Sequence, residues 1–231
     1  MLVSRGVLSS RGGLRAETFQ LLNNIAANAP RSDAANHQYI TTESLSVQEV
    51  QALFNNISLS PREDRVIRAL KFLEPRIERI AIAQVSPIFL SGFTSGFTTR
   101  GGIKVKLKDS DEPIPIGSLG EGTWRMLALA ITLSRSINSL LLIDEIDTGF
   151  HHTVMTSMWK FVAEAAKEFN IQVFATTHSY DCVRSLAAVC RDDVRIRSDV
   201  TIQRLEPGCE KTISYNEAEI KALARDNIES R

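Results

Sequence analysis

The sequence lacks any apolar run long enough to cross a lipid bilayer, and it lacks an excess of charge of either sign. Lys and Arg total 27 residues, as do Asp and Glu, so the formal net charge is zero. A membrane-spanning helix needs roughly 20 consecutive apolar residues. A balanced charge gives no global field that would draw the chain to nucleic acid or to an anionic membrane. We therefore expect a globular protein that makes no membrane contact, in which any nucleic-acid contact comes from a local patch.

The chain also has few cysteines. They are Cys182, Cys190 and Cys209, and no CxxC pair occurs among them. An odd number without paired spacing predicts neither a disulfide framework nor a structural zinc site, and it is typical of a reducing compartment. We therefore expect a cytoplasmic location.

The first sixteen residues contain no acidic residue. The stretch MLVSRGVLSSRGGLRA has arginines and several serines, which is the composition of an organelle transit peptide. It lacks a clear amphipathic period, however. An exposed basic arm and an interior piece of a longer protein are therefore alternative interpretations.

The residues before about position 85 carry local structural signals but few chemical groups of note. Two capping-box patterns, Ser46 to Glu49 and Ser60 to Glu63, predict helix starts, the second with a proline in its first turn. Alternation of apolar and polar residues predicts strands at 77–83 and at 103–107. We predict that residues 1–85 form a mixed, mostly helical N-terminal arm and that residues 86–231 form a second unit.

After Pro115 the pattern predicts alternating helices and strands. Helical periodicity extends from about Thr123 to Ser136 and again over 154–169, and the apolar runs 140–143 and 171–175 predict buried strands. A strand, a helix and a strand with short links make a parallel crossover unit, which is nearly always right-handed. Both strands therefore end at the same edge of a largely parallel sheet with flanking helices.

Acidic and polar residues follow both predicted strands at that edge. The first strand leads directly into Asp144 and Glu145, and the second leads into Thr176, Thr177 and His178. A buried carboxylate without a partner is costly, so the acids either meet a cation or mark where the strand leaves the core. Because open α/β sheets bind ligands at the carboxyl ends of their strands, we expect these residues to converge on one crevice.

The chemistry of this set suits a metal bound to phosphate. An acid at the end of an apolar strand can hold Mg²⁺ against nucleotide phosphates, which suits Asp144, and Glu145 is placed to orient an attacking water molecule. Upstream, SLGEGTWRML opens an amphipathic helix with glycines that let an anion approach backbone N–H groups. Each signal alone has a structural alternative: a strand that exits into solvent, a tight turn that caps a helix, and a strand-end histidine without a ligand.

In this order and spacing, the segments SLGEGTWRML, LLLIDEIDTGFHH and FATTHSYD resemble the second, C-terminal lobe of an ABC-type ATPase head. That group includes structural-maintenance-of-chromosomes (SMC) and RecF-like proteins. The chain is most similar to AAA ATP-binding proteins of the overcoming-lysogenization-defect (OLD) type, from about Arg62 to the C-terminus. The resemblance implies a P-loop-NTPase-like α/β lobe over residues 86–231, with ATP and Mg²⁺ as cofactors.

The resemblance also implies roles for individual residues. Asp144 would be the Walker B magnesium ligand, Glu145 the catalytic base and His178 the switch histidine, while Asp147 would lie in the D-loop that reaches across a dimer. The signature loop and the serine before it would bind the nucleotide of the opposite head. Its residues are Ser118, Leu119, Gly120, Glu121, Gly122 and Thr123.

Two features depart from the family pattern. The signature serine, which meets the γ-phosphate of the partner's ATP, is Gly120 here, with Ser118 as the candidate substitute. No GxxxxGK[ST] occurs in the sequence, and the glycines between Gly6 and Gly13 have no lysine among them. Because phosphoryl transfer relies on that cradle and its lysine, we expect the chain alone to bind MgATP poorly and to hydrolyse it hardly at all. The expectation is a head that lacks its Walker A lobe, as a truncated gene product or as one half of a split ATPase.

Three functional hypotheses follow. The first is an ATPase head lobe that works as a homodimer or with a Walker A-bearing partner chain; a DNA-related or defence role is implied by the resemblance alone. The second is a non-catalytic interaction module that keeps the fold. The third is a metal-dependent hydrolase that uses Asp144, Asp147, His151 and His152. It ranks last because adjacent histidines on a helix cannot both face one ion, and the resemblance makes them the start of a helix.

The resemblance also raises the question of a nuclease. OLD-like proteins often carry a C-terminal nuclease domain of Toprim type. The printed sequence ends soon after a helix that is predicted near 214–217. We therefore expect no such nuclease in this chain.

Overall fold

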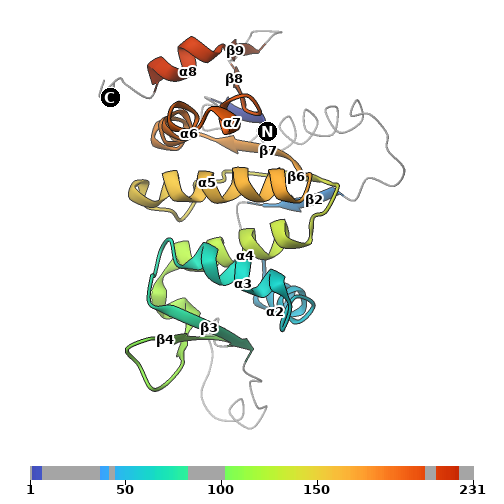
Figure 1. The fold of residues 1–231 in the computed structure, drawn as a ribbon, viewed down its shortest axis with the longest axis vertical. Coiled ribbons are helices and arrows are strands. Elements are labelled where there is room, and N and C mark those ends of the chain that lie inside the picture. Colours follow the sequence, from blue (N-terminus) through green and yellow to red (C-terminus); the bar gives the residue numbers. More distant parts are fainter. Residues whose placement is uncertain (1, 7–36, 42–44, 83–101, 206–211, 224–231) are drawn as a thin grey trace, which may run out of the picture.

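The computed structural model describes residues 2–6, 37–41, 45–82, 102–205 and 212–223. These residues form two β-sheets with helices between and around them (Figure 1). The larger sheet has six strands in the order β2-β6-β7-β1-β8-β9. In that order the strands are His37–Ile40, Leu140–Ile143, Gln172–Thr177, Leu2–Gly6, Thr201–Leu205 and Ile213–Tyr215.

The larger sheet is parallel except at one edge. β6 pairs in parallel with β2 and with β7, and β1 pairs in parallel with β7 and with β8. Among the strands that the structure describes in this sheet, β9 alone is antiparallel, to β8. Helix α4 (Glu121–Arg135) precedes β6, α5 (His152–Glu168) joins β6 to β7, and α6 (Tyr180–Asp192) follows β7. The predicted parallel sheet with flanking helices is therefore confirmed.

The order of the strands decides where the helices lie. The chain passes from β2 to β6, from β6 to β7 and from β7 across β1 to β8, always in the same direction. Right-handed crossovers in one direction place their helices on one face of the sheet, and α5 indeed packs against both α4 and α6. The step from β1 to β2 runs the opposite way. The winding of the sheet therefore reverses between β7 and β1.

A smaller antiparallel sheet lies on the other side of α4 from α5 (Figure 1). Its strands are β3 (Ile77–Ile82), β4 (Ile103–Leu107) and β5 (Ile114–Pro115). β4 alternates buried with partly buried residues, which confirms the predicted half-exposed strand. The short 3₁₀ turn η2 (Ile116–Leu119) then leads into α4.

The two predicted helix starts are confirmed, with one difference. Helix α2 (Val47–Asn55) begins at a complete capping box formed by Ser46 and Glu49. Helix α3 (Pro61–Leu70) begins after Ser60, whose hydroxyl accepts the Arg62 N–H at 3.3 Å. The Glu63 carboxylate accepts the N–H of Leu59 at 2.6 Å, so the second capping box is not closed in the predicted way.

The other helices in the described residues lie near the C-terminus. They are α7 (Val194–Arg197) and α8 (Glu217–Leu223). α8 starts where the sequence predicts a helix, and Asn216 and Glu219 cap it by exchanging two hydrogen bonds. None of the helices in the described ranges combines the length and the apolarity that a membrane span requires.

The first 85 residues contribute more strand than the predicted, mostly helical arm contains. β1 lies between β7 and β8, and β2 forms the edge beside β6, so both belong to the main sheet. Local sequence gave no sign of them because their hydrogen bonds go to strands more than a hundred residues away. The predicted boundary near residue 85 lies outside the described residues.

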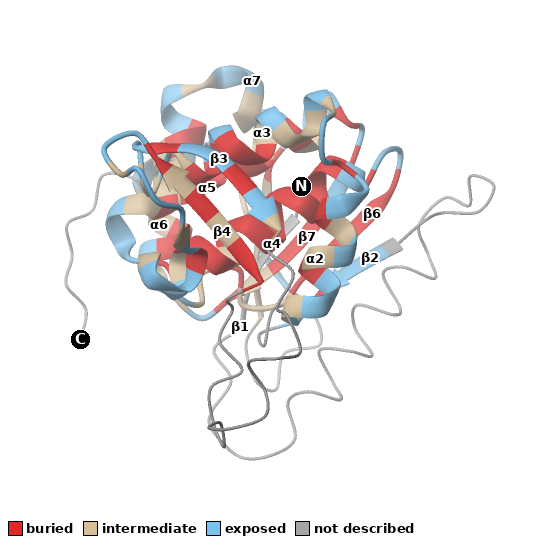
Figure 2. Cartoon of the chain, turned by 90° about the horizontal axis from the view of Figure 1, so that it is seen from below, coloured by how far each residue is buried: buried red, intermediate tan, exposed pale blue. Residues whose placement is uncertain are grey.

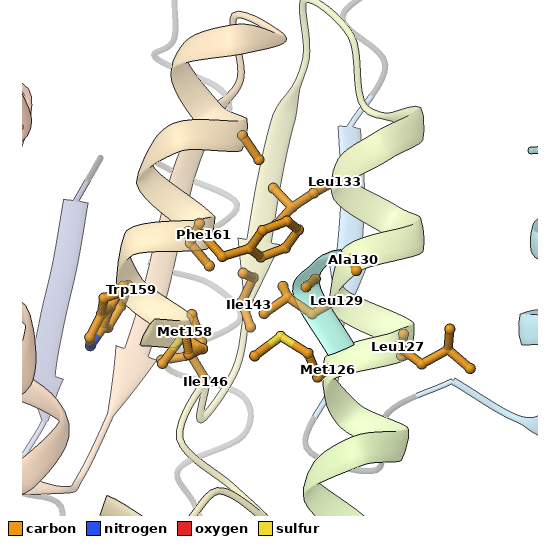
Figure 3. Close-up of a cluster of buried hydrophobic side chains, with 14 of the residues drawn as sticks. Met126, Leu127, Leu129, Ala130, Leu133, Ile143, Ile146, Met158, Trp159 and Phe161 are labelled. Atoms are coloured by element: carbon orange, nitrogen blue, oxygen red, sulfur yellow. The ribbon is translucent and has the colours of Figure 1, made fainter. Parts of the chain in front are cut away.

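Helix α4 forms the centre of the core. Its buried residues lie on almost all sides, since it packs against α2 and α3 on one side and against α5 on the other. Figure 2 shows buried residues along α4 and β6, whereas α7 is exposed or only partly buried. In Figure 3, Leu129 and Leu133 from α4 meet Ile143 from β6 and Phe161 from α5. This layer supports β6 directly beneath its carboxyl end.

Truncation of that layer tests its contribution to stability. Leu133 is fully buried, whereas Leu59 is 99% exposed. We expect Leu133→Ala to lower the free energy of unfolding by about 2–5 kcal/mol in urea denaturation, because it removes apolar contacts and leaves a cavity. The matched control Leu59→Ala should change it by less than about 0.5 kcal/mol. Equal effects of the two substitutions would show that α4 is not the core helix.

Candidate functional site

The carboxyl ends of β6 and β7 lie side by side. Their parallel register pairs Leu140 with Gln172 and Ile143 with Ala175, so Asp144 follows at the level of Thr176. β6 is wholly buried, as are Val173 to Ala175 of β7, and the side chains of Asp144 and Thr176 that follow these buried runs are partly exposed. The predicted convergence of the DE pair and the TTH triplet on one edge is confirmed.

The hydroxyl of Thr176 joins the two acids. Its O–H donates to Asp144 Oδ1 at 2.6 Å, and its oxygen accepts the backbone N–H of Glu145 at 3.0 Å. The Asp144 N–H in turn donates to the Ile40 carbonyl of β2 at 2.9 Å. Asp144 is thus held from both neighbouring strands.

Glu145 has an uncommon backbone conformation. Its φ is 47°, in the left-handed region that non-glycine residues seldom adopt. Its carboxylate accepts the hydroxyl of Thr148 at 3.1 Å. Backbone strain of this kind is often found at functional sites, where the surrounding hydrogen bonds maintain it.

The Asp147 side chain makes a hydrogen bond within the chain. Its carboxylate accepts a hydrogen bond from the Thr177 hydroxyl, whose oxygen also accepts the Ser179 N–H at 3.0 Å. Ser179 caps α6 by accepting the Cys182 N–H at 3.2 Å. Asp147 therefore lies near the N-terminus of a helix, where a negative charge is favoured.

The same neighbourhood makes Cys182 unreactive. Burial raises the pKa of the Cys182 thiol to about 12, and the Asp147 carboxylate adds to the effect. The Trp159 indole N–H donates to the Cys182 carbonyl at 3.0 Å, which fixes α6 against α5. This cysteine is a core residue and no nucleophile at neutral pH.

His178 follows Thr177 at the same edge and is exposed. It comes directly before the cap of α6. Because its ring is not enclosed by the core, it is available to a ligand that approaches the edge from solvent.

The segment 118–123 packs against the turn that carries the acids. Ser118 and Gly120 are exposed, and Gly120 has a φ of 90°, which a glycine adopts without strain. The Thr123 hydroxyl donates to the Leu119 carbonyl at 3.0 Å and closes the start of α4. A Cβ at Gly122 would lie 2.9 Å from the Gly149 carbonyl oxygen. The backbone at the start of α4 therefore lies directly against the backbone of the acidic turn.

A second contact joins the same two segments. Gly149 has a φ of 80°, and a Cβ on it would come within 3.1 Å of Glu121 Cγ. Glu121 in turn lies 4.0 Å from Arg125, which a Cβ at Gly149 would also approach. The signature-like loop and the acidic turn are thus coupled inside one chain.

The histidine pair lies at the start of a helix. His152 is the first residue of α5 and His151 is its N-cap, as the resemblance implies. The His151 ring lies 3.0 Å from the Thr153 hydroxyl. Within the described ranges no group of three or more His, Cys, Asp or Glu side chains could hold a metal ion. The site of the proposed hydrolase, Asp144 with Asp147 and both histidines, has no counterpart there.

A magnesium ion that also binds substrate phosphates fits Asp144 better. Such an ion takes oxygen ligands and needs only one or two carboxylates from the protein. The Thr176 hydroxyl donates a hydrogen bond to Oδ1 of Asp144, while Oδ2 has no hydrogen-bond partner among the described residues. One carboxylate oxygen is therefore oriented by the protein and the other can face a cation.

The strand order places one more element at this edge. β1 pairs with β7 so that Arg5 is level with Thr177. Ligands of open α/β sheets bind where the winding reverses, which here is between β7 and β1. The site thus extends from Asp144 on β6 toward the carboxyl end of β1.

Sequence reasoning did not find every residue of this site. Thr176 and Thr177 are predicted by position, but no role is assigned to their hydroxyls, and Thr148 and Ser179 are missed. The sequence signal that could have identified these residues is their hydroxyl chemistry. Hydroxyl residues at a strand end beside acids can orient those acids.

The chain was compared with known protein families. A family model described as "AAA domain, putative AbiEii toxin, Type IV TA system" matches residues 14–182, which is more than half of the chain. The matched range includes the loop 118–123, Asp144, Glu145 and His178. Together with the parallel sheet, the match identifies an α/β fold of the P-loop NTPase type, as the sequence predicts.

A curated relative covers a shorter part of the chain. An "ATP/GTP phosphatase" of Helicobacter pylori (strain ATCC 700392 / 26695) is 30% identical over 99 residues. The match covers 42% of this chain and 27% of that protein. The chain therefore spans about a quarter of the length of the relative that it matches.

Solved structures with similarity to this chain include ABC and SMC proteins. One is cbiO1 from Clostridium perfringens, part of the ABC transporter complex cbiONQ, at 18% identity and a TM-score of 0.47. It is matched over 95% of this chain and 79% of that chain. Another is the SMC head domain from Thermotoga maritima, at 10% identity and a TM-score of 0.44, over 77% of this chain and 52% of that one.

The contact between Gly122 and Gly149 gives a test of the coupled segments. We expect Gly122→Ala to destabilise the protein by about 1–3 kcal/mol, because backbone atoms cannot move aside as a flexible side chain can. The gain in helix propensity from glycine to alanine opposes this by at most about 1 kcal/mol. Urea denaturation measures the balance, with Ser118→Ala at an exposed position as the control. A more stable Gly122→Ala protein would contradict the packing described here.

Proposed function

We propose that this chain, which belongs to the AAA domain family matched over residues 14–182, is an ATP-binding and ATP-hydrolysing head lobe of a dimeric or split ATPase. The observation that carries the proposal is the arrangement of Asp144 and Glu145 directly after β6, beside Thr176 of the adjacent parallel strand β7. Both are oriented by Thr176 at the edge where the winding of the sheet reverses.

Each residue of the edge has a proposed task. Asp144 would hold Mg²⁺ with the carboxylate that Thr176 orients. When bound, the ion neutralises charge on the β- and γ-phosphate oxygens. Glu145 orients and deprotonates the attacking water, and His178 contacts the γ-phosphate from the exposed end of β7.

Residues beside the edge are proposed to serve a second head. Ser118 and Gly120 are exposed at the start of α4, where backbone N–H groups favour an anion. The predicted nucleotide contacts Ser118 to Thr123 then bind the triphosphate of the other subunit. Asp147 contacts the same triphosphate only if its hydrogen bond with Thr177 breaks. A DNA-related or defence role rests on the family resemblance alone.

The phosphate cradle must come from elsewhere in this proposal. No GxxxxGK[ST] occurs in the sequence, so a Walker A-bearing partner chain, or a segment outside the printed sequence, supplies the lysine and the loop. The relative named as an ATP/GTP phosphatase supports a nucleoside triphosphate as substrate, with GTP as the competitor to test.

The missing motif also favours a second candidate, an interaction module that keeps the fold without catalysis. Such a module would bind its partner equally well after Glu145→Gln and His178→Ala. An ATPase lobe would associate with its partner only when nucleotide is bound, and it would lose hydrolysis when Glu145 is changed.

Measurements of nucleotide binding test the proposal. They are made first on the isolated chain and then on the chain with a candidate Walker A-bearing partner. We expect Asp144→Asn to weaken Mg²⁺-dependent ATP binding about tenfold or more, because it removes the charged ligand. Glu145→Gln should leave binding nearly unchanged and reduce hydrolysis by about 10²–10⁴-fold. Glu164→Gln, an exposed acid on α5, is the matched control.

Two outcomes would count against the proposal. One is binding that is the same with Mg²⁺ and with a chelator. The other is hydrolysis that persists in Glu145→Gln. Isothermal titration calorimetry measures the binding, and phosphate release measures the hydrolysis independently.

A further inference from the structure

We propose that Thr176 is a positioning residue whose hydroxyl sets the geometry of both acids at once. The inference rests on the proposed function for its catalytic meaning. Its structural part, that one hydroxyl fixes Asp144 and Glu145 together, stands on hydrogen bonds within the chain.

The direction of the two hydrogen bonds is fixed. The Glu145 N–H can only donate, so the Thr176 oxygen must accept it, at 3.0 Å. The hydroxyl proton is then left for Asp144 Oδ1, at 2.6 Å, a length typical of a bond to a carboxylate. Thr176 therefore fixes the orientation of the Asp144 carboxylate through Oδ1.

The backbone of the acidic turn depends on the same residue. The Thr176 carbonyl accepts the Ile146 N–H at 3.0 Å, so Thr176 holds the peptide groups on both sides of Glu145. Glu145 lies between them at a φ of 47°, which is sparsely populated for a side chain of its size. The two hydrogen bonds from β7 maintain this conformation and with it the direction of the Glu145 side chain.

The β-branched side chain suits this task. Two heavy atoms on Cβ restrict χ1, so the hydroxyl of a threonine is better fixed than that of a serine. A residue of the same shape without a hydroxyl, such as valine, keeps the packing and loses both hydrogen bonds.

Thr177 provides a matched control on the same strand. It is fully buried, and its hydroxyl contacts Asp147 and the Ser179 N–H but neither Asp144 nor Glu145. Thr177→Val therefore removes a hydroxyl of the same kind from the next position and leaves the DE pair untouched.

The experiment compares Thr176→Val, Thr176→Ser and Thr177→Val with the unchanged chain, and Thr176→Ala replaces the valine variant if that one does not fold. The first measurement is hydrogen exchange of the Glu145 amide by NMR. It needs no nucleotide. We expect exchange to be about tenfold or more faster in Thr176→Val, because a protecting acceptor is gone, and nearly unchanged in Thr176→Ser and Thr177→Val.

The second measurement is the Mg²⁺ concentration that gives half-maximal ATP binding, in the presence of whichever chain supplies the phosphate cradle. Loss of a group that orients a metal ligand typically costs about 10–100-fold in metal affinity. We expect a rise of that size in Thr176→Val, partial recovery in Thr176→Ser and a smaller effect in Thr177→Val, whose hydroxyl holds Asp147 and neither acid of the DE pair.

Amide exchange and Mg²⁺-dependent binding together distinguish a failure of the proposed function from a failure of the positioning role of Thr176. If the unchanged chain shows no Mg²⁺-dependent binding, the proposed function fails, and the exchange rate of the Glu145 amide still decides whether Thr176 holds the turn. If binding is Mg²⁺-dependent but Thr176→Val behaves like Thr177→Val, the positioning role is overturned. Unchanged exchange in Thr176→Val overturns it as well.

Discussion

The parallel pairing of β6 with β7 is the constraint on which the rest of the site depends. Because the register places Ile143 opposite Ala175, the next residue of each strand, Asp144 and Thr176, leaves the core at the same level. A shift of one residue would turn these side chains to opposite faces of the sheet. The hydrogen bond between them exists only in this register. The wholly apolar strand therefore serves the polar site by fixing where the first polar side chain emerges.

The same logic connects the core to the turn beyond the strand. Helix α4 fills the space between the two sheets, and its first residues contact the turn through Gly122 and Gly149. Neither glycine can gain a side chain without displacing backbone or neighbouring groups. The start of α4 and the residues that follow Asp144 are therefore in direct contact. This gives a short physical path between the signature-like loop and the acids.

Much of this arrangement is predictable from the sequence because it is local. Capping residues mark the start of α2, and apolar periodicity marks α4, β6, α5 and β7. The handedness of crossover units then places the DE pair beside the TTH triplet. β1 and β2 are not predictable in this way, since their hydrogen bonds come from partners far along the chain. The left-handed backbone of Glu145 is equally hidden, because tertiary hydrogen bonds impose it on a residue that does not prefer it.

Paramagnetic broadening by Mn²⁺ with a non-hydrolysable ATP analogue, in the presence of whichever chain supplies the phosphate cradle, tests the central claim most directly. The claim is that the carboxyl edge of β6 and β7 is the metal-nucleotide site. The account predicts that amide signals of 144–148 and 176–179 broaden first, while Leu140 and Gln172, at the other end of the same strands, broaden last. Broadening that is strongest at Leu140 and Gln172, or that is uniform along both strands, would contradict it.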